Sequence, residues 1–377
     1  YAMKYVDNEN PMASMRFSCT QVSPNALVYG TEDDLRKGLS SIETYAKPER
    51  VFVESNCSVS LVGDDVQGIA DQMDLPWPVY AMDSGGMKGS FEAGYSAASL
   101  RIEKEMKTKE MIPASVNVLG LSTVHMKGRE DAEEIRRLLS LCGIRVISMP
   151  GGGSNWDDIM GAPSASLNIV VRDELGLSLA KQMERDFGTP YMSCGLPYGT
   201  DGTMAWLSEI IEKLGAGELT RASHEAAKLK EFLLRKGNNL ESLWGPLWFD
   251  AVLISAPPSE ALGIAEAIRS EWIDTARLCI HAQCETEKST PAADAIRVVM
   301  KNEKEIAKDY EDWQGGLVLS SSHETHLLRR MGRSFTGFHI ALPSHDEVHF
   351  TDLPQCGLRG AGYLYEQLWN AKLRKQR

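Results

Sequence analysis

The residues best suited to chemistry lie in the segment Glu54–Asp65, whose sequence is ESNCSVSLVGDD. Cys57 follows the β-branched run Arg50–Glu54, so it stands just after an expected buried strand. A thiolate presented there can ligate a metal cluster. Asp64 can cap a following helix. The alternative, which spacing alone leaves open, is a buried free cysteine.

The glycine-rich segment after Pro150 is a second candidate. Gly151, Gly152, Gly153 and Ser154 resemble a phosphate-cradling loop, because glycine allows close backbone approach to an anion. The segment matches neither GxGxxG nor the Walker sequence. The alternative is a plain turn that Ser154 caps.

The charge and hydropathy of the chain exclude several classes of protein. The 377 residues carry a formal net charge of −12, whereas nucleic-acid binding needs a concentrated basic face. No apolar run reaches the ~20 residues of a membrane helix, and the opening Tyr1–Pro11 is too polar for a secretory signal. We therefore expect a cytoplasmic protein with no nucleic-acid or membrane partner. The missing initial Met fits a fragment, a processed form or part of a longer protein.

The seven cysteines are odd in number and contain no CxxC pair. This usage fits free thiols in a reducing compartment better than a disulfide scaffold or a four-thiolate zinc site.

Short β-branched runs alternate with amphipathic stretches along the chain, which predicts parallel sheets with right-handed crossovers. The predicted strands are 50–54, 78–82, 115–119, 144–148, 167–172, 190–192, 250–255, 276–281, 317–320 and 338–342. The predicted helices are 64–73, 91–106, 128–141, 154–161, 173–187, 200–214, 222–236, 259–270, 292–303, 323–331 and 357–377.

We predict an α/β protein of three Rossmann-like domains with parallel sheets flanked by helices. The first domain covers residues 1–110 and carries Cys57, the second 111–245 and the third 246–345, followed by a loop and helix at 346–377. Ligands gather at the carboxyl ends of strands in such sheets. The loops at those ends are 55–65, 120–128, 150–155, 194–203, 255–259 and 343–360.

Several segments, in this order, resemble the nitrogenase component 1 type oxidoreductase family. The Cys57 segment is similar to that family's strand–Cys–Pro–(Ile/Val)–Gly–Leu–Ile–Gly–Asp–Asp signature, with Ser58 and Ser60 in place of Pro and Gly. The other similar segments are ALVYG (26–30), VNVLG (116–120), APSASLNIV (162–170), GLPYG (195–199) with Gly202 and Thr203, and the turn and helix from Gly357 to Trp369. The resemblance covers nearly the whole chain from Cys19 onward.

This resemblance implies that Cys57 ligates an iron–sulfur cluster, [4Fe-4S] or related, at a subunit interface. The family's upstream Gly–Cys ligand segment has no counterpart here, so the remaining ligands would come from residues missing from this sequence or from a partner subunit. The implied partners are a homologous component 1 subunit, in a homo- or heterodimer or a heterotetramer, and an ATP-dependent iron–sulfur reductase protein.

The resemblance also places Arg172 where the molybdenum enzyme has a cysteine that binds its large metallocluster. Without that soft ligand, dinitrogen reduction is not expected. The guanidinium is a fork suited to a carboxylate or phosphate, and its alternative role is a salt bridge. The family's glycine loops border the cofactor cavity, so Gly151–Ser154, Pro197 and Tyr198 are expected to line a pocket.

Three loop histidines are candidate proton donors, because the imidazole pKa lies near neutrality. They are His125, His345 and His349, and His345 falls near the family's second ligand to the large metallocluster. The alternative for each is a hydrogen-bonded loop histidine.

Three functions remain open. The first is a redox subunit that reduces a small molecule or a tetrapyrrole with electrons from the iron protein. The second is a non-catalytic scaffold for metallocofactor assembly. The third is a metal-chelate or small-molecule binding protein, and the fold does not choose among them.

Overall fold

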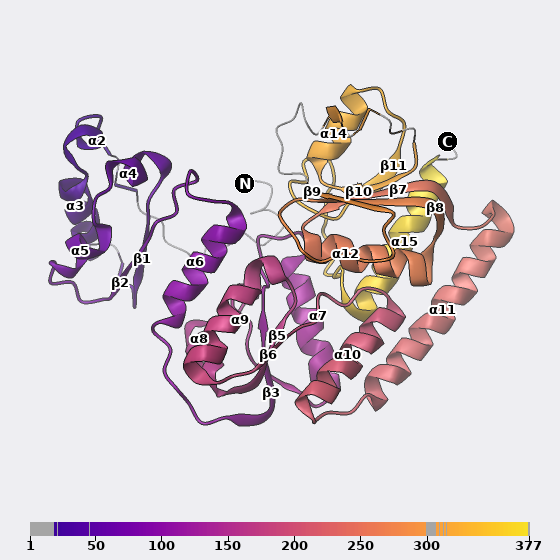
Figure 1. Cartoon of the computed structure of the whole chain (residues 1–377), viewed down its shortest axis with the longest axis horizontal. Coiled ribbons are helices and arrows are strands. Elements are labelled where there is room, and N and C mark those ends of the chain that lie inside the picture. The colour runs from indigo at the N-terminus through magenta and orange to yellow at the C-terminus, as the bar shows by residue number, and fades with distance from the viewer. Residues whose placement is uncertain are drawn as a thin grey trace. The chain divides into compact units, whose positions relative to one another are not determined.

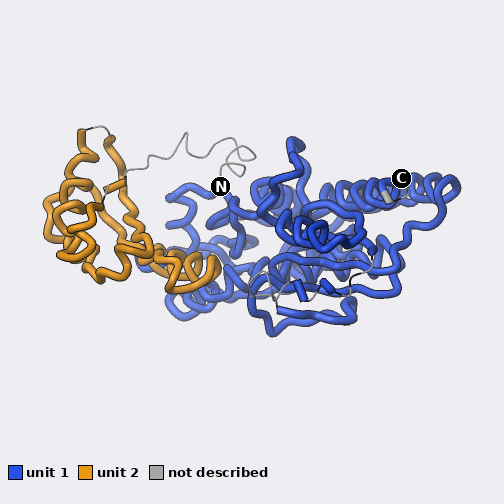
Figure 2. The backbone as a smooth tube through the Cα atoms, turned by 90° about the horizontal axis from the view of Figure 1, so that it is seen from above, with its two compact units in different colours: residues 1–8, 103–377 blue, residues 9–102 orange. Residues whose placement is uncertain are grey.

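The computed structural model describes residues 19–20, 22–44, 46–298, 307–308, 310–311, 313 and 315–375. The described chain forms two compact units that divide between Ile102 and Glu103 (Figure 2). The predicted boundary after residue 110 lies just before strand β3 (Ile112–Leu119). The predicted boundary at 245/246 falls inside the larger unit and stays a prediction.

The smaller unit is a two-stranded parallel sheet with helices around it. Strand β1 (Val51–Glu54) pairs with β2 (Val79–Met82). Leu35, Leu39, Ile69 and Trp77 form its small apolar core. The helices are α2 (Ala26–Tyr29), α3 (Glu32–Ile42), α4 (Cys57–Val62), α5 (Val66–Asp71) and α6 (Phe91–Glu103).

The larger unit contains two parallel sheets (Figure 1). The first has the order β4-β3-β5-β6, with β4 (Arg145–Ser148), β5 (Ala165–Val170) and β6 (Tyr191–Ser193). The second has the order β11-β10-β7-β8-β9, with β7 (Trp248–Ala256), β8 (Asp274–Ala282), β9 (Ala295–Val298), β10 (Leu317–Ser320) and β11 (Thr336–His339). The predicted α/β class with parallel sheets and flanking helices is confirmed.

One continuous hydrophobic core joins the two sheets of the larger unit. It includes Ile169 from the first sheet, Ile254 from the second and Leu364 from the last helix. The helices are α7 (Gly128–Leu141), α8 (Trp156–Gly161), η2 (Ala162–Ser164), α9 (Asp173–Phe187), α10 (Thr200–Leu214), α11 (Thr220–Trp244), α12 (Pro258–Ala267), η3 (Ile268–Trp272), α14 (Ser322–Arg330) and α15 (Gly357–Lys375). Helix α12 packs on β7 and β8 and also contacts α9, so it joins the two sheets.

Three local expectations were wrong. The predicted helix 292–303 contains strand β9, because Ile296 and Val298 extend and pair with β8, while residues 299–303 lie outside the described residues. The expected loop around Cys57 is helix α4, which begins at Cys57 because the Asn56 side chain caps the N–H of Val59.

The predicted cap at Asp64 is also wrong. Asp65 caps α5 through the N–H of Gly68, whereas Asp64 accepts hydrogen bonds from the backbone and hydroxyl groups of Thr31.

Two glycines bring the end of β3 against the start of α9. Gly120 has a φ of +90°, and a Cβ there would lie 2.5 Å from the Arg172 carbonyl oxygen. A Cβ on Gly176 would lie 2.8 Å from the Gly120 nitrogen. Real Cβ atoms do not approach backbone so closely, so both positions require glycine for this packing.

We predict that Gly176→Ala lowers the free energy of unfolding by about 1–3 kcal/mol, because the added methyl must push α9 away from β3. Urea unfolding followed by circular dichroism measures the change. The matched control is Gly362→Ala inside α15, where the nearest atom would lie at an ordinary 3.6 Å. That variant should be neutral or up to about 1 kcal/mol more stable. Equal effects of the two substitutions would contradict the close approach.

Candidate functional site

The candidate site lies between the carboxyl ends of the two sheets of the larger unit. All strands in both sheets are parallel, but the side on which successive strands are added switches between β3 and β5 in the first sheet and between β7 and β10 in the second. Ligand crevices form at such switch points. The loop after β3 carries His125, and Arg172 lies two residues after the end of β5, at the start of α9. Helix α12 follows β7 after one residue and carries Glu260 in its first turn.

Arg172 lies between the carboxyl ends of the strands of the two sheets and contacts residues from both sides. Its guanidinium is fully buried, and Nε and Nη2 donate to Glu260 Oε1 at 3.0 and 2.6 Å. Nη1 donates to the carbonyl oxygen of Gly120 at 3.3 Å. The three segments that end β3, end β5 and begin α12 therefore meet at one cation.

Glu260 is held as a carboxylate. Its burial acts to raise the pKa, but the positive charge of Arg172 and the neighbouring His125 ring outweigh it and lower the pKa to about 2. His125 Nδ1 lies 3.4 Å from Glu260 Oε1. Burial likewise acts to lower the pKa of Arg172, and the charge of Glu260 instead raises it above its usual range.

Asp131, in the first turn of α7, faces the same guanidinium. Its Oδ2 lies 4.0 Å from Arg172 Nη2, and its Oδ1 accepts from the N–H groups of Gln355 and Cys356 at 2.7 and 3.0 Å. The side chain is 1% exposed. Burial raises its pKa to about 6 despite the Arg172 charge.

Two further groups complete the buried charge network. Glu174 in α9 accepts the hydroxyl of Ser259 in α12 at 2.5 Å, and its burial raises its pKa. The Tyr198 phenol is also buried, and its pKa is raised well above 10.0 by burial and by the charge of Glu260. The Tyr198 hydroxyl has no hydrogen-bond partner among the described residues.

The structure brings together most of the residues predicted for the larger unit. Arg172, His125 and Tyr198 share the Glu260 network. The Gly151 carbonyl accepts the N–H of Thr123 at 2.9 Å, which places the glycine turn beside the loop of His125. The Ser154 hydroxyl accepts the N–H of Met149 at 2.8 Å, and the Pro197 carbonyl accepts the N–H of Gly357 at 2.7 Å.

His345 and His349 lie in the segment between β11 and α15, where Glu347 stands between His349 and His339, the last residue of β11. The His339 ring contacts Ser344 through Nδ1 at 2.9 Å, and the His345 ring lies 6.5 Å from that of His323. His349 Nε2 lies 3.9 Å from Glu347 Oε2. The proton-donor role of all three predicted histidines stays a prediction.

Cys57 lies in the smaller unit and its side chain is exposed, so the alternative of a buried thiol is wrong. A Cβ on Gly86 would lie 3.5 Å from the Cys57 sulfur, so a glycine turn passes close to the thiol. Among the described residues, no group of three His, Cys, Asp or Glu side chains is arranged to hold a metal ion.

Sequence reasoning missed Glu260 and Asp131. Acidic residues in the first turn of a helix are typical, because they complement the helix dipole, so neither stands out by itself. The available signal in the sequence was Arg172 itself. An arginine that closely follows a buried strand needs carboxylate partners to offset the cost of burying its charge.

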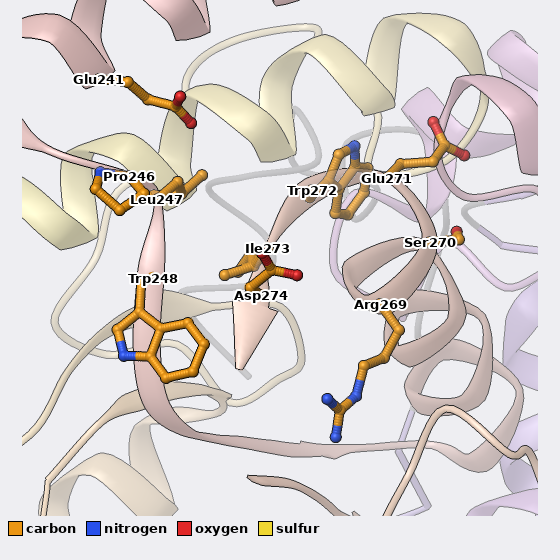
Figure 3. Close-up of a pocket in the computed structure, with 10 residues that line it drawn as sticks. All are labelled: Glu241, Pro246, Leu247, Trp248, Arg269, Ser270, Glu271, Trp272, Ile273 and Asp274. Carbon is orange, nitrogen blue, oxygen red and sulfur yellow. The ribbon is translucent and has the colours of Figure 1, made fainter. Parts of the chain in front are cut away.

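A separate pocket of about 330 Å³ lies at the amino ends of the strands of the second sheet, away from the carboxyl ends where the candidate site lies (Figure 3). It opens at the amino ends of β7 and β8, where Trp248 and Asp274 are neighbours in register. Arg269 lines it, but its guanidinium is engaged by Thr275, Ala292 and Asp294. The pocket therefore stands apart from the predicted carboxyl-edge loops.

The fold and site define an α/β protein whose buried ionic network lies between two opposed sheet edges. The family model "Nitrogenase component 1 type Oxidoreductase" matches residues 1–373, so the chain belongs to this family. The predicted resemblance is confirmed.

The chain is similar to several characterised proteins. It is 30% identical over 227 residues to the nitrogenase iron-molybdenum cofactor biosynthesis protein NifE of Clostridium pasteurianum, covering 59% of this chain and 47% of that protein. It is 24% identical over 373 residues to one of the subunits of the light-independent protochlorophyllide reductase of Chloroherpeton thalassium, covering 94% of this chain and 69% of that protein.

Solved structures support the same fold. "Nitrogenase Cp1 at pH 6.5" superposes with a TM-score of 0.73 at 16% identity, covering 95% of this chain and 82% of that one. Within the described residues, no helix is long and apolar enough to cross a membrane.

We predict that Glu260→Gln lowers the free energy of unfolding by about 3 kcal/mol at neutral pH, because Arg172 keeps its buried charge and loses its counterion. The pKa of Glu260 is lower in the folded protein, about 2, than its ordinary 4.5. Its stabilisation is therefore fully present above about pH 4.5 and is lost as the pH falls toward about 2.

Urea unfolding of both proteins across this pH range measures the difference. The exposed Glu133 on α7 provides the control, since Glu133→Gln should change stability by less than about 0.5 kcal/mol. A loss in Glu260→Gln that stays constant from neutral to acidic pH would show that the carboxylate charge is not responsible.

Proposed function

We propose that this chain is a subunit of a nitrogenase-like oxidoreductase of the cytoplasm. It receives electrons from an ATP-dependent iron–sulfur protein through a [4Fe-4S] or related cluster. Its substrate is a small molecule or a tetrapyrrole rather than dinitrogen. The family membership supports the class of chemistry, and the relative named as part of a protochlorophyllide reductase supports the tetrapyrrole option.

The observation that carries this proposal is the exposed thiol of Cys57 at the first residue of α4. Three large apolar side chains near Cys57 are also exposed. Leu61 in the same helix α4 is 71% exposed, and Tyr29 in α2, which packs on α4, is 87% exposed. Met87, next to Gly86, is 72% exposed. Exposed apolar side chains in such number are typical of a surface that a partner covers. They favour a cluster shared with a homologous subunit.

The described residues supply only one candidate ligand for such a cluster. Cys57 offers a single soft ligand, and iron–sulfur clusters commonly take four thiolates. The other ligands would therefore come from residues outside those described or from a partner chain. When bound, the cluster would supply one-electron transfer.

In the larger unit, the chain's own residues would bind and protonate the substrate. His125 is positioned to hold a proton beside Glu260, and Arg172 fixes the orientation of Glu260 through two hydrogen bonds. Because the Arg172 guanidinium is buried and engaged, we assign it to the wall of the site rather than to direct contact with the substrate. The turn Gly151–Ser154 and the loop carrying Pro197 and Tyr198 would complete that wall, with His345 and His349 on the loop before α15.

A second candidate is a non-catalytic scaffold for metallocofactor assembly. The similarity to the cofactor biosynthesis protein favours it. A third, a metal-chelate or small-molecule binding protein, would need no iron at Cys57. Turnover separates the first two functions, because a scaffold releases a cofactor and forms no reduced product.

We predict that anaerobically purified protein with its complete natural chain contains iron and gives a low-temperature EPR signal on reduction. Cys57→Ser should abolish or alter that signal and lower the iron content by about one half or more, because the cluster loses a thiolate.

The matched control is Cys194→Ser in the larger unit, where burial raises the pKa of the thiol to about 12 and disfavours a thiolate. That variant should keep its iron. A folded wild-type protein that contains no iron would contradict the assignment of Cys57 as a cluster ligand and would favour the small-molecule binding function. Iron without product formation from tetrapyrrole or small-molecule substrates, in the presence of an ATP-dependent iron protein, would favour the scaffold.

A further inference from the structure

The pocket at the amino ends of β7 and β8 combines aromatic rings with carboxylates. Its walls come from the end of α11, the start of β7 and the run from η3 into β8. Trp248 and Trp272 supply two indole surfaces (Figure 3). Glu241, Glu271 and Asp274 supply three carboxylates. The volume of about 330 Å³ is that of a site for a small molecule.

The Trp248 indole is held by its edge and keeps a ring face open. Its Nε1 donates to Asp250 Oδ1 at 3.3 Å, and the two residues lie on the same face of β7, because side chains alternate along a strand. The only donor of the indole is thereby used, while Trp248 stays 43% exposed. The ring face carries the negative part of the aromatic quadrupole, so it attracts a cation.

Asp274 stands next to this ring. Trp248 and Asp274 are partners in the register of the parallel pair β7–β8, so their side chains leave the same face of the sheet from strands about 4.8 Å apart. In the view of Figure 3, Asp274 lies between Trp248 and Trp272. Asp274 is exposed, and its carboxylate has no hydrogen-bond or ion-pair partner among the described residues. A cation placed there would meet the ring face and a full negative charge together.

The other charged groups of the pocket already have partners. The Arg269 guanidinium donates to Asp294 Oδ2 at 2.8 Å, so the one arginine among the lining residues is neutralised. Glu271 accepts the first N–H of α10 at 2.6 Å. Glu241 adds a further negative charge, which acts on the Lys372 ammonium. The pocket therefore favours a positively charged ligand over an anion.

We propose that this pocket binds a small organic cation that carries an apolar group, of the class of primary arylalkylamines. The ammonium lies against the Trp248 ring and Asp274, and the apolar group lies toward Pro246 and Trp272. This inference goes beyond the proposed redox function and does not rest on it.

Binding of 2-phenylethylamine to the protein with its complete chain tests the inference. The comparison ligand is 2-phenylethanol, which has a neutral hydroxyl in place of the ammonium. Titrations at neutral pH, followed by saturation-transfer NMR, give both affinities. The amine should bind about tenfold more tightly than the alcohol, because only the ammonium gains from the ring and the carboxylate. This preference should shrink as the salt is raised from about 50 mM to about 500 mM.

Two substitutions locate the site. Trp248→Ala and Asp274→Asn should each weaken binding of the amine about three- to fivefold, because each removes one attraction for the cation. The matched control is Trp244→Ala, since Trp244 is exposed by a similar 49% at the end of α11 but does not line the pocket. That variant should keep the wild-type affinity.

Equal affinity for the amine and the alcohol would overturn the inference, and so would a wild-type protein that binds no amine up to about 10 mM. A loss in Trp244→Ala as large as that in Trp248→Ala would do the same. The comparison of the two ligands on the wild type is decisive by itself if a variant does not fold. The titrations need no iron and no electron donor, so their failure and the failure of the proposed redox function are distinguishable.

Discussion

The larger unit is organised around one constraint, the burial of a permanent positive charge at Arg172. Moving such an ion out of water costs several kcal/mol, and only well-placed acceptors offset that cost. Glu260 supplies one oxygen to two guanidinium nitrogens, and the Gly120 carbonyl supplies another acceptor. Because these acceptors come from α12 and from the end of β3, both must converge on the end of β5. The two sheet edges are thereby brought together.

This convergence explains local features that would otherwise be unconnected. Gly120 and Gly176 allow backbone to touch backbone between β3 and α9, which brings the Gly120 carbonyl within reach of the guanidinium. Helix α12 starts immediately after β7, so its first turn already carries Glu260 at the sheet edge. Ser259 beside it binds Glu174 of α9, which adds a second polar contact between the sheets. Each feature serves the same close approach.

The architecture could be predicted because its determinants are local. Arg172, His125 and Tyr198 were also predicted as site residues, but their carboxylate partners were not, because those partners are distant in sequence. Alternating β-branched runs and amphipathic stretches identified β7 and α7 from their own residues. Arg172 and Glu260 are 88 residues apart, and each has an ordinary local role as a residue at a helix start. Strand β9 was wrongly predicted as a helix for a related reason, since the contact that determines it is not local. Its alanine-rich surroundings favour a helix locally, but pairing with β8 overrides that preference.

The paired state of Arg172 bears on the kind of substrate the larger unit can accept. By the family resemblance, this position would carry a soft thiolate ligand for a large metallocluster. Here a hard cation with its own counterion fills it, so the residue offers neither a metal ligand nor an open charge for an anion. What remains nearby is the His125 ring and the Asp131 carboxyl, whose pKa burial raises to about 6. Under the proposed function, His125 and Asp131 would serve a substrate that takes up protons, while Cys57, an exposed thiol at the start of α4, belongs to the other unit.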